Sequence, residues 1–231
     1  MRGIVYCAGV GPGDPELMTL KTARLIRENR VIAVPGDRAE ESLAWRIAAA
    51  AVPELAEKET VALPAPMTAD RAAVDAAHRE GVRRIEQYLD RGENVVYLTL
   101  GDPSVYCTFS YLRPLLEADG CTVETTPGVT SFCAAAARLG IPLTEWDEPL
   151  RVVPAAHRTG EPLDRRGTYV LMKSGGRMAK VKELLRRSGR EAAAVENCGL
   201  EGERVYRNLE EIPDDAGYFT LIVAKEPRER A

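Results

Sequence analysis

The feature that most constrains the fold is a short apolar segment that ends abruptly at a Gly-Asp-Pro turn. Residues 94–100 read Asn-Val-Val-Tyr-Leu-Thr-Leu, and Gly101, Asp102 and Pro103 follow directly. A run of this composition, closed by turn residues, predicts a buried β-strand. Gly101 lets the backbone approach a ligand closely, and Pro103 favours an extended Asp102 that suits a helix N-cap. Because ligands bind beyond the carboxyl ends of strands in open α/β sheets, this turn is either a plain helix cap or part of a binding site.

The same pattern of strand and turn occurs near the N-terminus. Residues 3–8 predict a strand, and a glycine-rich loop ending in Gly13-Asp14-Pro15 follows it. Asp14 is placed to cap a helix that has Pro15 at its first position and runs to about residue 27. Four such units are expected before residue 118, with further strands at 31–34, 59–63 and 94–100 and helices at 41–52, 68–90 and 105–116. Repeated strand–helix units predict a parallel sheet with right-handed crossovers.

The polar turn at residues 117–120 is the expected domain joint, which gives an N-terminal domain at 1–118 and a C-terminal domain at 119–231. The second half is expected to open with a strand at 121–125 and to end with two strands, near 204–207 and 218–224, that no helix separates. Part of its sheet should therefore be antiparallel. The predicted fold class is α/β, with two αβα domains, the first built on a mainly parallel sheet and the second on a mixed sheet.

Composition excludes several classes of protein. The chain has 231 residues, 45% of them hydrophobic, and a formal net charge of −4. No apolar run reaches the roughly 18 residues of a membrane span, and the N-terminus leads straight into a strand, so we expect a cytoplasmic protein without a membrane partner. The five cysteines form no C-x-x-C pair, which predicts reduced thiols and no metal site. Scattered Lys and Arg residues argue against a nucleic-acid partner.

Two alternatives from other functional classes stay open at this point. The first glycine loop departs from the dinucleotide pattern G-x-G-x-x-G because Asp14 stands where the third glycine belongs. Asp37 nevertheless lies near the position of a ribose-binding acid, so a nicotinamide-dependent oxidoreductase remains a hypothesis. A non-catalytic module that binds a nucleotide or a partner is the other.

The chain is poor in acid–base machinery. Its two histidines, His78 in a predicted helix and His157 in a polar loop, lie outside the glycine-rich turns and are expected to be structural or solvated. We assign no catalytic residue. Such a chain suits a reaction in which a nucleophilic substrate attacks in line and the leaving group departs without a proton, as in methyl transfer from a sulfonium. One crevice could gather the residues at the ends of the apolar strands, which are Gly101, Asp102, Thr130, Ser131, Met172 and Asn197.

Four motifs in order resemble the tetrapyrrole methylase family of S-adenosylmethionine-dependent enzymes. They are residues 9–21, 100–103, 126–131 and 169–172, and the likeness covers nearly the whole chain. Within the family, residues 99–106, 110–112, 130–136, 141–143 and 171–174 look like the branch that methylates C20 of precorrin-2 or cobalt-factor II in cobalamin (vitamin B12) biosynthesis. Methylation of a different ring carbon is the alternative within the family.

The resemblance implies a homodimer that binds S-adenosylmethionine in a cleft between its two domains, releases S-adenosylhomocysteine and takes a small-molecule tetrapyrrole as substrate. It also implies which residues contact the cofactor: Pro12, Leu100, Gly101, Asp102, Val105, Tyr106, Thr130, Ser131, Met172, Asn197, Cys198, Thr220 and Leu221. Because the substrate carries several carboxylates and the protein is acidic, we expect a local basic rim, drawn from Arg38, Arg113 or Lys173.

Overall fold

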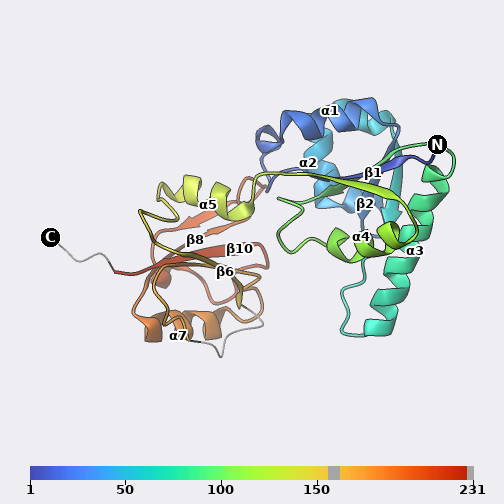
Figure 1. Ribbon diagram of the computed structural model, residues 1–231. Helices are drawn as coiled ribbons and strands as arrows, with labels where there is room; N and C mark the ends of the chain where they lie inside the picture. The colour runs from blue at the N-terminus through green and yellow to red at the C-terminus, as the bar shows by residue number, and fades with distance from the viewer. Residues whose placement is uncertain (156–161, 228–231) are drawn as a thin grey trace. The chain divides into compact units, whose positions relative to one another are not determined.

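The computed structural model describes residues 1–155 and 162–227 and divides the chain into two compact units (Figure 1). The first unit is Met1–Thr130, and the second begins at Ser131. His157 lies outside the described residues. In the part of the chain that is described, no helix combines the length and the apolar character needed to cross a membrane.

The first unit is built on a five-stranded sheet in the order β3-β2-β4-β1-β5, with every pair of neighbours parallel. The strands are β1 (Ile4–Gly9), β2 (Val31–Pro35), β3 (Glu59–Leu63), β4 (Val95–Thr99) and β5 (Thr122–Thr126). The α-helices are α1 (Leu20–Glu28), α2 (Leu43–Ala51), α3 (Arg71–Leu89) and α4 (Phe109–Ala118), and the short 3-10 helices are η1 (Pro15–Leu17), η2 (Ala39–Glu41) and η3 (Pro53–Glu57). The predicted parallel sheet is confirmed.

Strand β5 corrects the predicted domain boundary. We assigned this segment to the second domain, but it pairs with β1 at the edge of the first sheet, with Ile4 opposite Thr122. The first unit accordingly ends after Thr130 and not after residue 118. The turn at 117–120 is only the connection from α4 to β5. Sequence reasoning missed this because β5 reads Thr-Val-Glu-Thr-Thr, and an edge strand that is largely exposed lacks the apolar pattern of the central strands.

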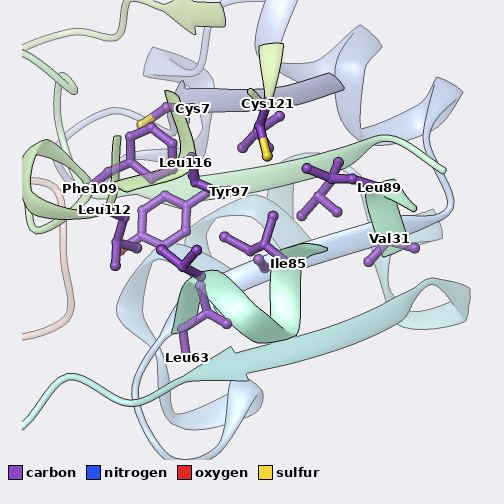
Figure 2. Packing of buried hydrophobic residues seen from close by; sticks show 14 of the residues in the cluster. Cys7, Val31, Leu63, Ile85, Leu89, Tyr97, Phe109, Leu112, Leu116 and Cys121 are labelled. Atoms are coloured by element: carbon purple, nitrogen blue, oxygen red, sulfur yellow. The ribbon is translucent and has the colours of Figure 1, made fainter. Parts of the chain in front are cut away.

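One core of the first unit lies between the sheet and helices α3 and α4 (Figure 2). Alternate residues of the central strands point to this face, among them Val5 and Cys7 of β1 and Val95 and Tyr97 of β4. The Tyr97 ring packs on Phe109 at the start of α4, with 4.9 Å between ring centroids. Each large apolar side chain buried here adds about 1.5–3 kcal/mol to the free energy of unfolding. This packing holds in place the ends of the strands, which carry the loops described below.

Neither Asp-Pro turn starts an α-helix where we predicted one. Asp14 caps the 3-10 helix η1, and α1 begins only after Thr19, whose hydroxyl accepts a hydrogen bond from the Thr22 N–H at 3.2 Å. Helix α4 begins at Phe109, four residues later than expected. In both places the Asp side chain bonds a backbone N–H two residues on, so the sequence signal marks an Asx turn. The loops at this edge of the sheet are longer than the sequence suggested.

The second unit is built on a five-stranded mixed sheet in the order β6-β7-β10-β8-β9. Strands β6 and β7 are parallel, whereas β10 runs antiparallel to β7 and β8, and β9 runs antiparallel to β8. The predicted mixed sheet is confirmed. The elements are α5 (Ser131–Leu139), β6 (Leu150–Pro154), β7 (Thr168–Met172), α7 (Met178–Ser188), β8 (Glu191–Glu196), β9 (Arg204–Tyr206), η4 (Leu209–Glu211) and β10 (Thr220–Lys225).

Helices α5 and α7 cover opposite faces of this second sheet (Figure 1). Along β7, Tyr169 and Leu171 join the core that includes α7, while Val170 between them joins the core that includes α5. Successive side chains of a strand point to opposite faces of the sheet, and both faces of β7 are buried. The strand therefore reads as a continuous apolar run.

Candidate functional site

Two loops at the carboxyl edge of the first sheet are joined through their backbones. Gly11, in the loop after β1, and Gly101, in the loop after β4, form an antiparallel bridge, in which the Gly101 N–H donates to the Gly11 carbonyl at 2.8 Å. The Val10 N–H donates to the Thr99 carbonyl at 2.9 Å and extends the contact to the end of β4. The two loops that contain the Gly-Asp-Pro segments are therefore joined to each other by backbone hydrogen bonds.

A third loop, after β5, packs against these two at glycine contacts. A Cβ atom at Gly9 would lie 2.4 Å from the Gly101 carbonyl oxygen, and one at Gly128 would lie 2.2 Å from the same atom. Neither position has room for a side chain, so all three backbones can approach only because these residues are glycines. We did not predict a role for Gly128. The Pro127-Gly128 turn directly after β5 was the available signal.

Asp102 ties the loops together and does not cap a helix. Its Oδ2 accepts a hydrogen bond from the Gly128 N–H at 2.8 Å, and its Oδ1 accepts from the Ser104 N–H at 2.8 Å and from the Ser104 hydroxyl. Burial raises the pKa of the Asp102 carboxyl, but the hydrogen bonds from Ser104 and Gly128 outweigh burial and hold that pKa below its ordinary value. The carboxylate is therefore ionised, and its oxygens are already engaged by three donors.

The turn that follows Asp102 presents a strained aromatic residue. Tyr106 has a φ of 48°, and the residue is 45% exposed. A bulky residue in the left-handed region costs about 1–3 kcal/mol, and strain of this kind clusters at functional sites. Val105 before it is half-buried, as is Leu100, while Pro12 in the first glycine loop is buried.

Apart from Ser131, which starts α5, the predicted site residues of the second unit lie at one edge of its sheet. Because β10 lies between β7 and β8 and runs antiparallel to both, the ends of β7 and β8 meet the start of β10, where Thr220 pairs with Glu196. Met172 ends β7, and the residue after each of these strands is left-handed, with φ 56° at Lys173 and 52° at Asn197. Cys198 is half-buried, and Leu221 in β10 is buried.

Glu196 is a second residue that sequence reasoning missed. It is 8% exposed, and its carboxylate accepts hydrogen bonds from the Tyr206 hydroxyl at 2.8 Å and from the Gly217 N–H at 2.6 Å. These bonds hold the segment that leads into Thr220. A glutamate at the end of an apolar strand carries no sequence signal that separates such an anchor from a solvated residue.

Two predicted site residues carry buried hydroxyl groups that form no hydrogen bond within the described residues. They are Thr130, at the end of the first unit, and Thr220, at the start of β10. Ser131, the first residue of α5, is half-buried. A buried hydroxyl without a partner costs about 1–3 kcal/mol, so each of these two groups calls for an explanation.

Two of the three residues predicted for a basic rim already have acidic partners. Arg38 forms an ion pair with Glu41 at 3.3 Å, and Arg113 forms one with Glu117 at 2.7 Å. Both are exposed ion pairs, of the kind that contribute about 0–1 kcal/mol each to the free energy of unfolding.

The other titratable groups give little support to acid–base or metal chemistry at this edge. His78 is buried and stacks on the Tyr111 ring, with 5.3 Å between centroids, so it packs α3 against α4. Among the residues for which the structure gives positions, no group of three or more His, Cys, Asp or Glu side chains lies close enough to hold a metal ion.

The first glycine loop does not have the geometry of a dinucleotide turn. A dinucleotide site needs the loop to lead directly into the N-terminus of a helix, where the pyrophosphate binds. Here Gly11 is bridged to Gly101, Asp14 caps η1, and α1 begins only at Leu20. The local structure therefore counts against a nicotinamide-dependent oxidoreductase.

Several known methyltransferases are similar to this chain. Residues 4–213 match the family described as Tetrapyrrole (Corrin/Porphyrin) Methylases. The chain is 33% identical over 241 residues to the cobalt-precorrin-2 C(20)-methyltransferase of Salmonella typhimurium, covering 100% of both chains. It is 30% identical over 243 residues to the precorrin-2 C(20)-methyltransferase of Sinorhizobium sp, covering 99% of this chain and 97% of the relative.

A solved structure of a similar protein has the same fold as this chain. The uroporphyrin-III C-methyl transferase from Thermus thermophilus, complexed with S-adenyl homocysteine, superposes with a TM-score of 0.69 at 27% identity, covering 97% of this chain and 98% of that one. Since the family match reaches across both units and curated relatives are similar from end to end, the chain belongs to the tetrapyrrole methylase family and is a methyltransferase.

Proposed function

We propose that this protein transfers a methyl group from S-adenosylmethionine to C20 of precorrin-2 or of cobalt-factor II in cobalamin biosynthesis. The observation that carries the proposal is the end-to-end similarity, at 33% identity, to a cobalt-precorrin-2 C(20)-methyltransferase. A cytoplasmic location and a homodimeric state are part of the same proposal. A tetrapyrrole methylase acting at another ring carbon is the second candidate, favoured by the solved relative that is named for uroporphyrin-III.

The residues present fit a bound S-adenosylmethionine. The fused loops at Gly11, Gly101 and Gly128 bring backbone groups to one edge of a sheet without intervening side chains, as a ligand with many polar atoms requires. The buried hydroxyls of Thr130 and Thr220 form no hydrogen bond with any described residue, so a polar group of such a ligand can pair with them. We therefore assign cofactor binding to the residues implied by the resemblance, with Gly9 and Gly128 added as backbone contacts that shape the site.

Asp102 has a positioning role in this proposal. Its carboxylate is held by Ser104 and Gly128, so it fixes the distance between two cofactor loops and is not free to accept a proton from the substrate. The cofactor supplies an electrophilic methyl group on a sulfonium. The chain's own contribution is to hold donor and acceptor in line, which supplies up to about 7–11 kcal/mol of rate acceleration in well-oriented reactions.

Two measurements test the proposed function. Calorimetry with S-adenosylhomocysteine should show binding, and failure to bind at high micromolar concentrations would remove the donor from the proposal. The purified protein should then be incubated with precorrin-2 and with its cobalt-bearing counterpart, using S-adenosylmethionine labelled with carbon-13 in the methyl group. Mass spectrometry should show one added methyl, and the carbon-13 signal should place it at C20. A methyl at another position would favour the second candidate.

A further inference from the structure

Two exposed aromatic residues stand directly before β10, at the edge of the second sheet that carries predicted cofactor residues. Tyr218 is 48% exposed, and Phe219 is 46% exposed. Their ring centroids lie 5.3 Å apart, and the ring planes stand at 81° to each other, which is the T-shaped arrangement that aromatic pairs favour. The two rings therefore form one exposed apolar surface, which we call the aromatic pair.

The turn that carries the aromatic pair is held by a buried carboxylate. The Gly217 N–H, directly before Tyr218, donates to Glu196 at 2.6 Å. The Tyr206 hydroxyl donates to the other oxygen of the same carboxylate at 2.8 Å. The Thr220 N–H donates to the Gly217 carbonyl at 3.1 Å and closes the turn. The backbone under the rings is thus fixed before any ligand arrives, so binding there costs little conformational entropy.

The aromatic pair lies between two predicted cofactor residues. Thr220 follows Phe219 in the chain, and the Asn197 N–H donates to the Phe219 carbonyl at 3.3 Å. The hydroxyl of Thr220 is buried and has no hydrogen-bond partner among the residues that the structure describes. A molecule that contacts the rings therefore lies beside the molecule that these two residues hold. For a methyltransferase, the neighbour of the methyl donor is the methyl acceptor.

A loop with two basic residues packs against the same turn. A Cβ atom at Gly175, in the loop after β7, would lie 2.7 Å from the Cα atom of Tyr218, so the two backbones are in close contact. Lys173 and Arg177 lie two residues to either side of Gly175, and Arg177 is exposed. Ammonium and guanidinium groups pair with carboxylates. An apolar aromatic surface beside two cations matches a conjugated macrocycle that carries carboxylate arms.

We propose that Tyr218 and Phe219 contact the face of the tetrapyrrole substrate. Lys173 and Arg177 then lie near its carboxylate arms, and Glu196 is a positioning residue that acts through the turn. Flat conjugated rings stack on aromatic side chains, and sites for such ligands combine apolar walls with a few polar groups. The proposal rests on the proposed function, because it takes the ligand beside the predicted cofactor residues to be the methyl acceptor.

The first experiment measures the binding of uroporphyrin III, a stable polycarboxylate tetrapyrrole, by the quenching of its fluorescence, with and without S-adenosylhomocysteine. Tyr218→Leu and Phe219→Leu each keep an apolar side chain but remove a ring, and each should raise the dissociation constant about five- to tenfold. Tyr218→Phe keeps the ring and should bind as the wild type does. Trp146→Ala is the matched control, since this exposed aromatic residue precedes β6 at the opposite edge of the sheet, and its substitution should leave the constant unchanged.

The second experiment tests whether Glu196 acts through the aromatic pair. Glu196→Ala removes the acceptor of the Gly217 N–H and should weaken porphyrin binding as much as loss of a ring does. Glu196→Gln keeps one acceptor oxygen and should restore most of the binding. Tyr206→Phe removes only the neighbouring donor and should weaken binding less than Glu196→Ala does. Added to a chain that carries both leucine substitutions, Glu196→Ala should cause no further rise in the constant, and a further rise overturns the positioning role.

Turnover with precorrin-2 adds an independent readout. The leucine variants and Glu196→Ala should raise KM and leave kcat within about twofold of the wild type, because the contact is made with the substrate before methyl transfer as well as during it. A loss of kcat with unchanged KM overturns the proposal.

The remaining outcomes separate this proposal from the proposed function. Unchanged porphyrin binding by both leucine variants overturns the substrate contact, whether or not those variants lose stability in urea or change their oligomeric state. An absence of porphyrin binding by the wild type also overturns it. A rise confined to the dissociation constant of S-adenosylhomocysteine assigns the rings to the cofactor and overturns it as well. Porphyrin binding that depends on the rings, in a protein that does not bind S-adenosylhomocysteine, supports the aromatic surface and counts against the proposed function.

Discussion

At the scale of single residues, the two glycines with the closest contacts decide whether the loops can meet. Gly128→Ala would place a methyl group 2.2 Å from the Gly101 carbonyl oxygen, so the loops must separate. We expect a loss of about 1–3 kcal/mol in the free energy of unfolding and weaker binding of S-adenosylhomocysteine. Urea denaturation and calorimetry measure the two effects.

The matched control for this substitution is Gly81→Ala in α3. There a Cβ atom would meet the side chains of Leu112, at 3.6 Å, and Leu63, at 3.8 Å, which are ordinary van der Waals distances, and alanine is the better helix former. The free energy of unfolding should rise by up to about 1 kcal/mol, with cofactor binding unchanged. Equal effects of the two substitutions would mean that the glycine contacts at the loops are unimportant.

Asp102 gives a prediction about pH. Its folded-state pKa is lowered, so its ionisation stabilises the fold above the unfolded-state pKa of about 4, and this stabilisation is lost as pH falls through the lower folded-state value. Asp102→Asn should reduce the free energy of unfolding at pH 7 by about 1–3 kcal/mol and weaken the loss of stability in acid. Urea denaturation at pH 7 and pH 3 tests this. A variant with the acid sensitivity of the wild type would exclude the role of Asp102 as a tie between loops.

At the scale of helices and strands, the sequence predicted the elements that are marked by a local pattern of residues. The βα repeats of the first unit follow from apolar runs and turn residues, and they are confirmed. The expected antiparallel pairing in the second sheet is also confirmed, although η4 separates β9 from β10 and each of these strands pairs with β8. Strand β5 was assigned to the wrong unit because an exposed edge strand has no such run. The contacts among Gly9, Gly101 and Gly128 are tertiary, so no spacing in the sequence could reveal them.

The placement of β5 can be checked with fragments. A chain of residues 1–130 keeps the partner that covers β1, whereas a chain of residues 1–118 leaves β1 as an open edge and removes the buried Cys121 from the core. We expect the longer fragment to unfold cooperatively in urea and the shorter one to aggregate or to unfold without a clear transition. Cooperative unfolding of the shorter fragment would show that β5 is dispensable for the first unit.

At the scale of the whole molecule, cofactor binding should be linked to stability through two buried hydroxyls that have no partner among the described residues. Thr130→Val and Thr220→Val each remove one of these buried hydroxyls, for which residues 1–155 and 162–227 supply no partner, so the protein without added ligand should gain about 1 kcal/mol in the free energy of unfolding. The stabilisation added by saturating S-adenosylhomocysteine should fall by a similar amount, because the bound ligand loses a hydrogen bond. Ser174→Ala is the control, since its hydroxyl is equally buried and unpaired but lies outside the predicted cofactor residues. Thermal unfolding with and without the ligand separates the two effects. If all three variants shift both states equally, the hydroxyls are defects of packing and take no part in holding the cofactor.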